Sequence, residues 1–380
     1  MYSHRGALSG WATRWWPHLT ALSGSPTAGP VAWLWLVLGA TSVAAFPANW
    51  GIGLFQAKNA VFITGACALV IWLVPNWALR GFLGWALVSF AWTGGMNWAM
   101  AGLLGLFAWA LVYALAGHLS SGQWAALQYP ITAIVGFQLA WMTLQAFNVD
   151  PIFISVGITG VPREGLRDIT GWFGNAMDAA LFLGLCLPLL LRWHWSLAAV
   201  TSLALVVWLR ATVGIVAVAL TWIWWGGLRR AWLTGSVAVA GGLAWASAFD
   251  HQGLLVGKRL VWAQTWHVAM LSPWVGWGPN ALDYRVQMYQ PGAAARWNFV
   301  FNEWLQGALE FGLVGVALAG CYAFLIAWRV ARRWRQCSPD VLAGAAILFL
   351  ASTFSIPFRI GPVALLGALY LGRLDAEVSR

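Results

Sequence analysis

Long apolar runs follow one another along almost the whole chain, and short polar turns separate them. Runs of about 18 or more apolar residues are long enough to cross about 30 Å of hydrocarbon as helices. The runs are continuous rather than alternating, and only helices and closed barrels satisfy the backbone inside a bilayer. The pattern therefore predicts an all-α, polytopic integral membrane protein with about 12 transmembrane helices. The predicted spans are 31–47, 59–75, 77–93, 98–117, 127–147, 174–191, 194–208, 211–226, 231–249, 303–328, 340–356 and 359–373.

The cations in the short turns predict the orientation of these helices. With the N-terminus inside, most of the turn arginines fall on the cytoplasmic side, as the positive-inside rule requires. They are Arg80, Arg192, Arg229, Arg230, Arg329, Arg332, Arg333, Arg335 and Arg373. Two polar segments, about 148–173 and 250–302, then lie on the outer side. We therefore expect one transmembrane domain over 1–380, with 250–302 as its large outer (periplasmic) loop.

The composition excludes a soluble domain. Apolar residues make up 61 % of the chain and charged residues 8 %, with a mean hydropathy of +0.72, whereas soluble domains carry about 25 % charged residues. The net charge of +10 falls mostly in the inner turns, so topology accounts for it better than a nucleic-acid partner does. The four cysteines are scattered without metal or redox spacing, and we expect no disulfide, metal or other cofactor.

Cations also occur on the predicted outer side, where topology requires few. Arg210 and Arg359 lie at tight outer turns, and Lys258 and Arg259 open an apolar segment. Ionisable groups at membrane depth are costly and often functional, and the planar guanidinium pairs with phosphate. The pattern predicts that outer cations bind a lipid-linked diphosphate, although long cationic side chains also extend to lipid headgroups without any such role. The further candidates are Arg163, Arg167, Arg285 and Arg296.

The segment 257–271 is predicted to be an amphipathic helix. Arg259, Ala263 and His267 recur every four residues and so share one helical face. This spacing separates an imidazole from a guanidinium by about two helical turns. His267 is therefore either a candidate base or a hydrogen-bonded residue at the membrane interface.

The stretch RLVWAQTWHVAMLSPWVGWGPNAL, followed by NEWLQGALEFGLVG, resembles the bacterial O-antigen ligase and polymerase superfamily, which includes the pilin-type protein O-oligosaccharyltransferases. Members carry an Arg, a Trp and a P-x-x-G-x-G turn in the large periplasmic loop. The matching residues are Arg259, Trp262 or Trp266, Pro273, Gly276 and Gly278. A second motif runs from a His–Asn pair to two glycines, and Asn302, Gly312 and Gly315 match it. Phe301 stands where the family has His.

The resemblance extends upstream and covers roughly 140–328. Gly171, Phe173 and Asn175 match a G-x-F-x-N-x-N motif, in which Met177 replaces the second Asn. Arg210 falls where members carry an arginine after a span. Gln145 and Asp150–Pro151 are similar to the family's stretch before its outer loop. The spans before this region match in hydropathy alone.

The resemblance implies a glycosyltransferase at the periplasmic face of the bacterial inner membrane. Its donor is a glycan on undecaprenyl diphosphate, and its acceptor is lipid A core, a growing glycan or a protein hydroxyl. Preorganised arginines stabilise a diphosphate leaving group without a metal, and the resemblance assigns Arg210 and Arg259 to this role. A nearby base helps to remove the acceptor proton. With Phe301 in the histidine position, either His267, Glu303 or Asp168 takes this role, or acid–base catalysis contributes less in this member.

Some of these residues also have ordinary structural explanations. Asn302, which the resemblance makes a candidate substrate-binding residue, could instead cap the following helix. Glu303 could interact with the dipole of that helix. Glu310 lies within a span and is harder to explain in this way. Gly312, Gly315 and Gly320 are typical of close helix packing, and Gly276 and Gly278 of turns.

Two other functions stay open. Phe301 favours a non-catalytic protein that keeps the fold. A flippase or transporter of lipid-linked glycan would need polar residues at mid-bilayer in several spans, and the early spans have almost none. No repeat of half-transporter length is visible, so an inverted-repeat transporter gains no support.

Overall fold

The computed structural model describes residues 67, 70–93, 96–147, 149, 169–173, 176–209, 212–225, 254–283, 300, 302–355 and 357–379. The chain divides into two compact units, 1–69 and 70–380, and all described residues except Cys67 belong to the second. Within the described residues every regular element is a helix. The predicted all-α class is therefore confirmed for this part of the chain.

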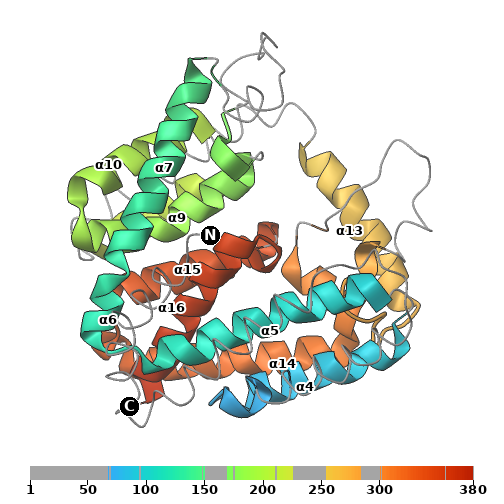
Figure 1. Cartoon of the computed structure of the whole chain (residues 1–380). Helices are drawn as coiled ribbons and strands as arrows, with labels where there is room; N and C mark the ends of the chain where they lie inside the picture. The colour runs from blue at the N-terminus through green and yellow to red at the C-terminus, as the bar shows by residue number, and fades with distance from the viewer. Residues whose placement is uncertain are drawn as a thin grey trace, which may run out of the picture. The chain divides into compact units, whose positions relative to one another are not determined.

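Several helices coincide with predicted spans, and all of these except α11 are labelled in Figure 1. They are α4 (Trp77–Ser89), α5 (Met96–His118), α7 (Gln128–Ala146), α9 (Ala176–Trp193), α10 (Trp195–Ala204), α11 (Thr212–Trp225), α14 (Glu303–Arg333), α15 (Pro339–Phe354) and α16 (Gly361–Ser379). Among them, α5 from Ala99, α9 and α14 are long and apolar enough to cross a membrane. Predicted spans 31–47 and 231–249 lie outside the described residues, and 59–75 lies mostly outside them. The total of twelve spans stays a prediction.

The other described elements lie between these helices along the chain. Helix α13 (Leu254–Met270) lies within the predicted outer loop, where a helix was expected, and α6 (Ser121–Ala126) precedes α7. The single-turn elements are η1 (Phe90–Trp92), η3 (Gly171–Phe173), η6 (Ala281–Asp283), η8 (Trp334–Gln336) and η9 (Pro357–Arg359). A π-helical turn at Leu205–Leu209 continues α10.

Helix α9 is the most buried helix among the described elements. All residues from Ala179 to Leu191 are buried, as expected of a helix that is apolar on every side. It contacts α7, α10, α11, α15 and α16. Small residues allow close packing elsewhere: a Cβ at Gly372 of α16 would lie 2.0 Å from the Tyr113 carbonyl oxygen of α5. These contacts make the interior of the second unit a set of directly packed helices.

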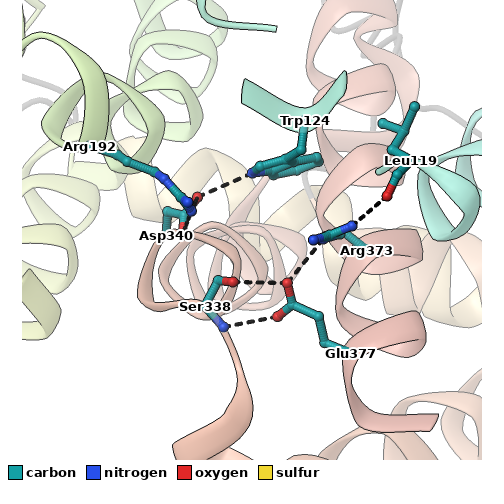
Figure 2. Close-up of polar contacts among 7 residues, drawn as sticks. All are labelled: Leu119, Trp124, Arg192, Ser338, Asp340, Arg373 and Glu377. Atoms are coloured by element: carbon teal, nitrogen blue, oxygen red, sulfur yellow. Dashed lines mark hydrogen bonds and ion pairs between the residues drawn. The ribbon is translucent and has the colours of Figure 1, made fainter. Parts of the chain in front are cut away.

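A polar network ties together the ends of α9, α15 and α16 (Figure 2). The Arg192 guanidinium, at the end of α9, contacts both carboxylate oxygens of Asp340 at 3.0 Å, and Trp124 Nε1 donates to the same carboxylate at 3.3 Å. Arg373 of α16 donates to Glu377 at 3.0 Å and to the Leu119 carbonyl at 2.7 Å. Arginines that the positive-inside pattern predicted on one side thus lie at helix ends that the structure brings together.

The neighbouring end of α14 is held in a similar way. Asp375 of α16 is buried and accepts hydrogen bonds from Tyr113 Oη at 2.5 Å and from Arg329 Nη1 at 2.8 Å. Arg333 donates to the Val378 carbonyl at 3.1 Å. Helices α5, α14 and α16 are therefore joined by charged hydrogen bonds at this end.

The network predicts an asymmetric mutational response at the Arg192–Asp340 pair. The Asp340 side chain is 1 % exposed, whereas that of Arg192 is 42 % exposed. Arg192→Ala leaves a buried carboxylate without its cation, and we expect a loss of about 2 kcal/mol in unfolding free energy. Asp340→Asn leaves an arginine that reaches water, and we expect a loss of about 1 kcal/mol in unfolding free energy. Thermal unfolding of the detergent-solubilised variants measures both, and the reverse order would contradict this explanation.

Candidate functional site

Helix α14 is broken near its N-terminal end. Gly312 has φ 64° and ψ −170°, which interrupts the helical backbone. The turn that follows α13 binds the groups freed by the break: Trp277 N donates to the Leu309 carbonyl at 2.9 Å, and Gly278 N donates to the Glu310 carbonyl at 2.8 Å. In return, Leu313 N donates to the Pro273 carbonyl at 2.7 Å. The turn at residues 273–278 therefore replaces hydrogen bonds that a continuous helix would have made itself.

Two glycines allow the turn and the break to approach each other. Gly276 has φ +69°, and a Cβ there would lie 2.4 Å from the Glu310 carbonyl oxygen. A Cβ at Gly312 would lie 2.3 Å from the Trp274 carbonyl oxygen. Gly276 and Gly278 are thus turn glycines with positive φ, as predicted. For Gly312 the prediction of ordinary helix packing is incomplete, because this residue is the break itself.

A buried ion pair lies beside the break. The guanidinium of Arg359, in η9, contacts the Glu310 carboxylate and donates to Asn280 Oδ1 at 3.1 Å. Gln306 Nε2 donates to the other carboxylate oxygen of Glu310 at 3.0 Å. The Glu310 side chain is 1 % exposed and that of Arg359 is 20 % exposed. Glu310, which was hard to explain from sequence, therefore has a cationic partner.

The predicted base Glu303 lies in the same region. It begins α14, and its Oε1 accepts a hydrogen bond of 2.8 Å from the Phe358 backbone N–H, next to Arg359. Asn302 is the N-cap, since its side chain accepts from Leu305 N at 2.9 Å. The capping role considered for Asn302 is confirmed. The carboxylate of Glu303 has a defined orientation, whereas the Asn302 oxygen is already used within the helix.

Helix α13 is packed against the turn and the start of α14. Trp262 Nε1 donates to the Val300 carbonyl at 2.8 Å, and Trp277 Nε1 donates to the Val268 carbonyl at 2.9 Å. Val268 belongs to a buried apolar cluster with Leu282 and Leu309. These two tryptophans therefore have a structural role: Trp262 fixes α13 to Val300, ahead of α14, and Trp277 fixes the following turn to α13.

The remaining predicted site residues are placed only in part. His267 lies on the exposed face of α13, together with Ala263, whereas Val261 and Thr265 are buried. Lys258 and Arg259 lie on α13, but their side chains fall outside the described part of the structure. Also outside it are Arg163, Arg167, Asp168, Arg210, Arg285, Arg296 and Phe301. The predicted convergence of Arg210 and Arg259 therefore stays a prediction.

The upstream motif residues contact one another at the start of α9. Gln145 Oε1 of α7 accepts from Thr170 N at 2.9 Å and from Gly171 N at 2.7 Å. Gln138 Oε1 accepts from Trp172 N at 3.2 Å. Gly171 has φ +62°, and a Cβ there would overlap the Gln138 side chain. Two buried glutamines thus hold the turn that leads into α9.

Glu310 and Arg359 are each visible in the sequence as charges in or beside apolar runs, but the sequence does not pair them. They are 49 residues apart, and Asn280 reaches Arg359 from a third segment, so no local spacing could have joined them. The available signal was that each is an ionisable or polar residue beside an apolar run. A search for opposite charges on the predicted outer ends of neighbouring spans would have found this pair.

Comparison with known proteins does not identify a family for this chain. No family model matches the chain, and no curated protein matches it. The resemblance to the O-antigen ligase and polymerase superfamily therefore depends on the motif residues described above, and the function has to be argued from the site.

Proposed function

We propose that this protein is a membrane glycosyltransferase of the O-antigen ligase or polymerase type. It moves a glycan from undecaprenyl diphosphate to a lipid, glycan or protein acceptor at the periplasmic face of the bacterial inner membrane. One observation carries the proposal furthest: the P-x-x-G-x-G turn and the Gly312 region of α14 hydrogen-bond directly to each other. These are two of the four motifs on which the resemblance rests, and they come from segments separated along the chain.

The proposed reaction follows from the chemistry of the leaving group. The bond between the donor sugar's anomeric carbon and the diphosphate oxygen breaks, and the acceptor hydroxyl oxygen bonds to that carbon. Undecaprenyl diphosphate leaves with the bonding electrons, and Arg210 and Arg259 stabilise its charge. The other cations around the diphosphate are supplied by Lys258, Arg285, Arg296, Arg163 and Arg167. The stabilisation needs no metal because guanidinium groups are permanently charged.

The acceptor proton is assigned to Glu303, with His267 and Asp168 as the other candidates. Glu303 is favoured because the Phe358 N–H fixes one of its oxygens, and a base has to be oriented toward the proton it accepts. Glu310 and Arg359 balance each other's charge, so we assign them a positioning role: they hold η9 and the outer-loop turn at the break in α14.

A transfer assay tests this function. The purified protein is reconstituted in liposomes with an undecaprenyl-diphosphate oligosaccharide and candidate acceptors, and release of undecaprenyl diphosphate is measured together with acceptor glycosylation. Arg210→Ala and Arg259→Ala should each lower the rate about 100-fold or more. Arg→Lys at the same positions keeps the positive charge but loses the paired N–H donors of the guanidinium. These variants should have transfer rates between those of wild type and the alanine variants. Full activity in both alanine variants would remove the mechanism.

Phe301 favours a second candidate, a non-catalytic assembly or binding protein. In this case the wild type shows no transfer with any acceptor, although it still binds the lipid-linked glycan. Phe301→His then provides the comparison, because it restores the residue that the resemblance expects. A gain of transfer by this variant indicates a chain whose catalysis has been lost, and no gain favours a purely structural use of the fold.

A further inference from the structure

The second half of α14 carries an exposed aromatic and cationic ladder. Phe324, Trp328 and Arg332 recur every four residues and therefore lie along one helical face. The rings of Phe324 and Trp328 are 6.3 Å apart and nearly parallel, at 21°. The Arg332 guanidinium carbon lies 4.2 Å from the centre of the Trp328 ring. Phe324 and Trp328 are 65 % and 49 % exposed, so this face does not pack inside the described structure.

The arginines at this end of α14 divide into two pairs. Arg329 and Arg333 bind Asp375 and the Val378 carbonyl of α16. Arg332 and Arg335 are exposed, and within the described part of the chain neither forms an ion pair with a carboxylate. Both instead contact indole rings, with Arg335 5.4 Å from the Trp334 ring centre. The outward pair therefore presents two positive charges beside exposed aromatic surface.

The order of the side chains along the helix matches the order of chemical groups in a phospholipid. Eight residues separate Phe324 from Arg332, which is about 12 Å at 1.5 Å per residue. One leaflet of hydrocarbon is about 15 Å thick, half of the full core. A ladder of this length runs from the acyl chains to the phosphate of a single leaflet, with apolar rings at one end and guanidinium groups at the other. The indoles suit the interface between the two.

We propose that Arg332 and Arg335, with the ladder Phe324–Trp328, bind the phosphate and acyl chain of one anionic phospholipid in the cytoplasmic leaflet. The guanidinium forks bind the phosphate, and the indole faces keep the guanidinium groups in place by cation–π contact. A net negative headgroup such as phosphatidylglycerol is favoured over a zwitterionic one because no acidic side chain within the described residues offsets the two charges. This inference is independent of the proposed glycosyl transfer.

The test measures lipid binding to the delipidated protein in detergent by native mass spectrometry, with thermal unfolding as a second measurement. Phosphatidylglycerol should bind more tightly and raise the unfolding temperature more than phosphatidylcholine of the same acyl length. The double variant Arg332→Gln/Arg335→Gln should bind phosphatidylglycerol about thirty-fold more weakly, from about 1 kcal/mol for each cation near a charged membrane surface. Trp328→Leu, which keeps apolar area but removes the stack, should weaken binding to a smaller degree.

Arg333→Gln is the matched control, since it removes the same charge one residue from Arg332 but from the inward pair. It should leave phosphatidylglycerol affinity within about two-fold of wild type, given the contact it makes inside the protein. Equal binding of the two lipids by wild type, or an equal loss in Arg333→Gln and the double variant, would overturn the proposal. Displacement of the lipid by inorganic phosphate alone would also overturn it, because the site would then be one for a free anion.

Discussion

Gly312→Ala is expected to lower the unfolding free energy of the protein by about 4 kcal/mol. The backbone at Gly312, with φ 64° and ψ −170°, lies in a region that only glycine adopts readily, and another residue there costs about 1–3 kcal/mol. An added Cβ would also lie 2.3 Å from the Trp274 carbonyl oxygen. Relief of that overlap separates the turn from α14 and breaks hydrogen bonds worth about 1 kcal/mol each.

Gly320 supplies the control on the same helix. Among the described residues a Cβ at Gly320 meets nothing within 4 Å, so the close helix packing predicted for this glycine is wrong. Alanine is favoured over glycine in a helix by up to about 1 kcal/mol. Gly320→Ala should therefore match or slightly exceed wild type in thermal unfolding of the solubilised protein. If Gly312→Ala and Gly320→Ala unfold at the same temperature, the turn does not stabilise the break as described.

The second large effect is expected at the Glu310–Arg359 pair. Arg359→Met removes the cation from a carboxylate that is 1 % exposed, and an uncompensated buried charge costs about 3–5 kcal/mol. Glu310→Gln in the same chain replaces that carboxylate with a neutral amide of similar shape. The double variant Glu310→Gln/Arg359→Met should therefore recover much of the loss, because no buried charge is left unpaired.

Thermal or denaturant unfolding of the two single variants and the double variant gives the coupling energy between these residues. We expect a coupling of at least about 2 kcal/mol, since the two side chains contact each other directly and the Glu310 carboxylate is buried. Strict additivity would mean that the pair is not formed in the folded protein. Retained folding with lost transfer activity in Arg359→Met would instead assign Arg359 to the substrate.

The helical architecture was predictable because apolar runs mark helix bodies and local signals mark their ends. Helix α14 begins at Glu303 as predicted, with Asn302 as its cap, and α15 begins at Pro339, one residue before the predicted start. The start of α14 depends on the Asn302 cap, and the start of α15 on Pro339 at its first position. Boundaries of this kind can be derived from hydropathy and capping preferences without knowledge of tertiary contacts.

The break in α14 could not be predicted in this way. The sequence around Gly312 is continuous with an apolar helix, and its glycines are typical of helix packing. The break is stable because the backbone of a separate turn, 273–278, supplies replacement hydrogen bonds. The residues next to Gly312 in sequence contain no information about where that turn lies in the folded protein. The Glu310–Arg359 pair could not be predicted for the same reason. Both charges can be recognised in the sequence, but they are 49 residues apart.

The two ends of α14 have different chemistry. At the N-terminal end, Glu303, Glu310 and Arg359 lie around a broken backbone, an arrangement that membrane proteins tolerate where the irregular segment is buried in protein or lines a cavity. At the C-terminal end, Arg329 and Arg333 are bound within a regular packed bundle. This contrast supports placing the proposed chemistry at the N-terminal end and a stabilising role at the other.

The most direct test of the proposed site is an experimental structure of the protein in a lipid nanodisc with undecaprenyl diphosphate bound. The guanidinium groups of Arg210 and Arg259 are predicted to lie within hydrogen-bond distance of the diphosphate, in one cavity bordered by the 273–278 turn and the start of α14. Guanidinium groups that are far apart, directed into lipid or held in separate ion pairs away from the bound diphosphate, would contradict the proposed active site.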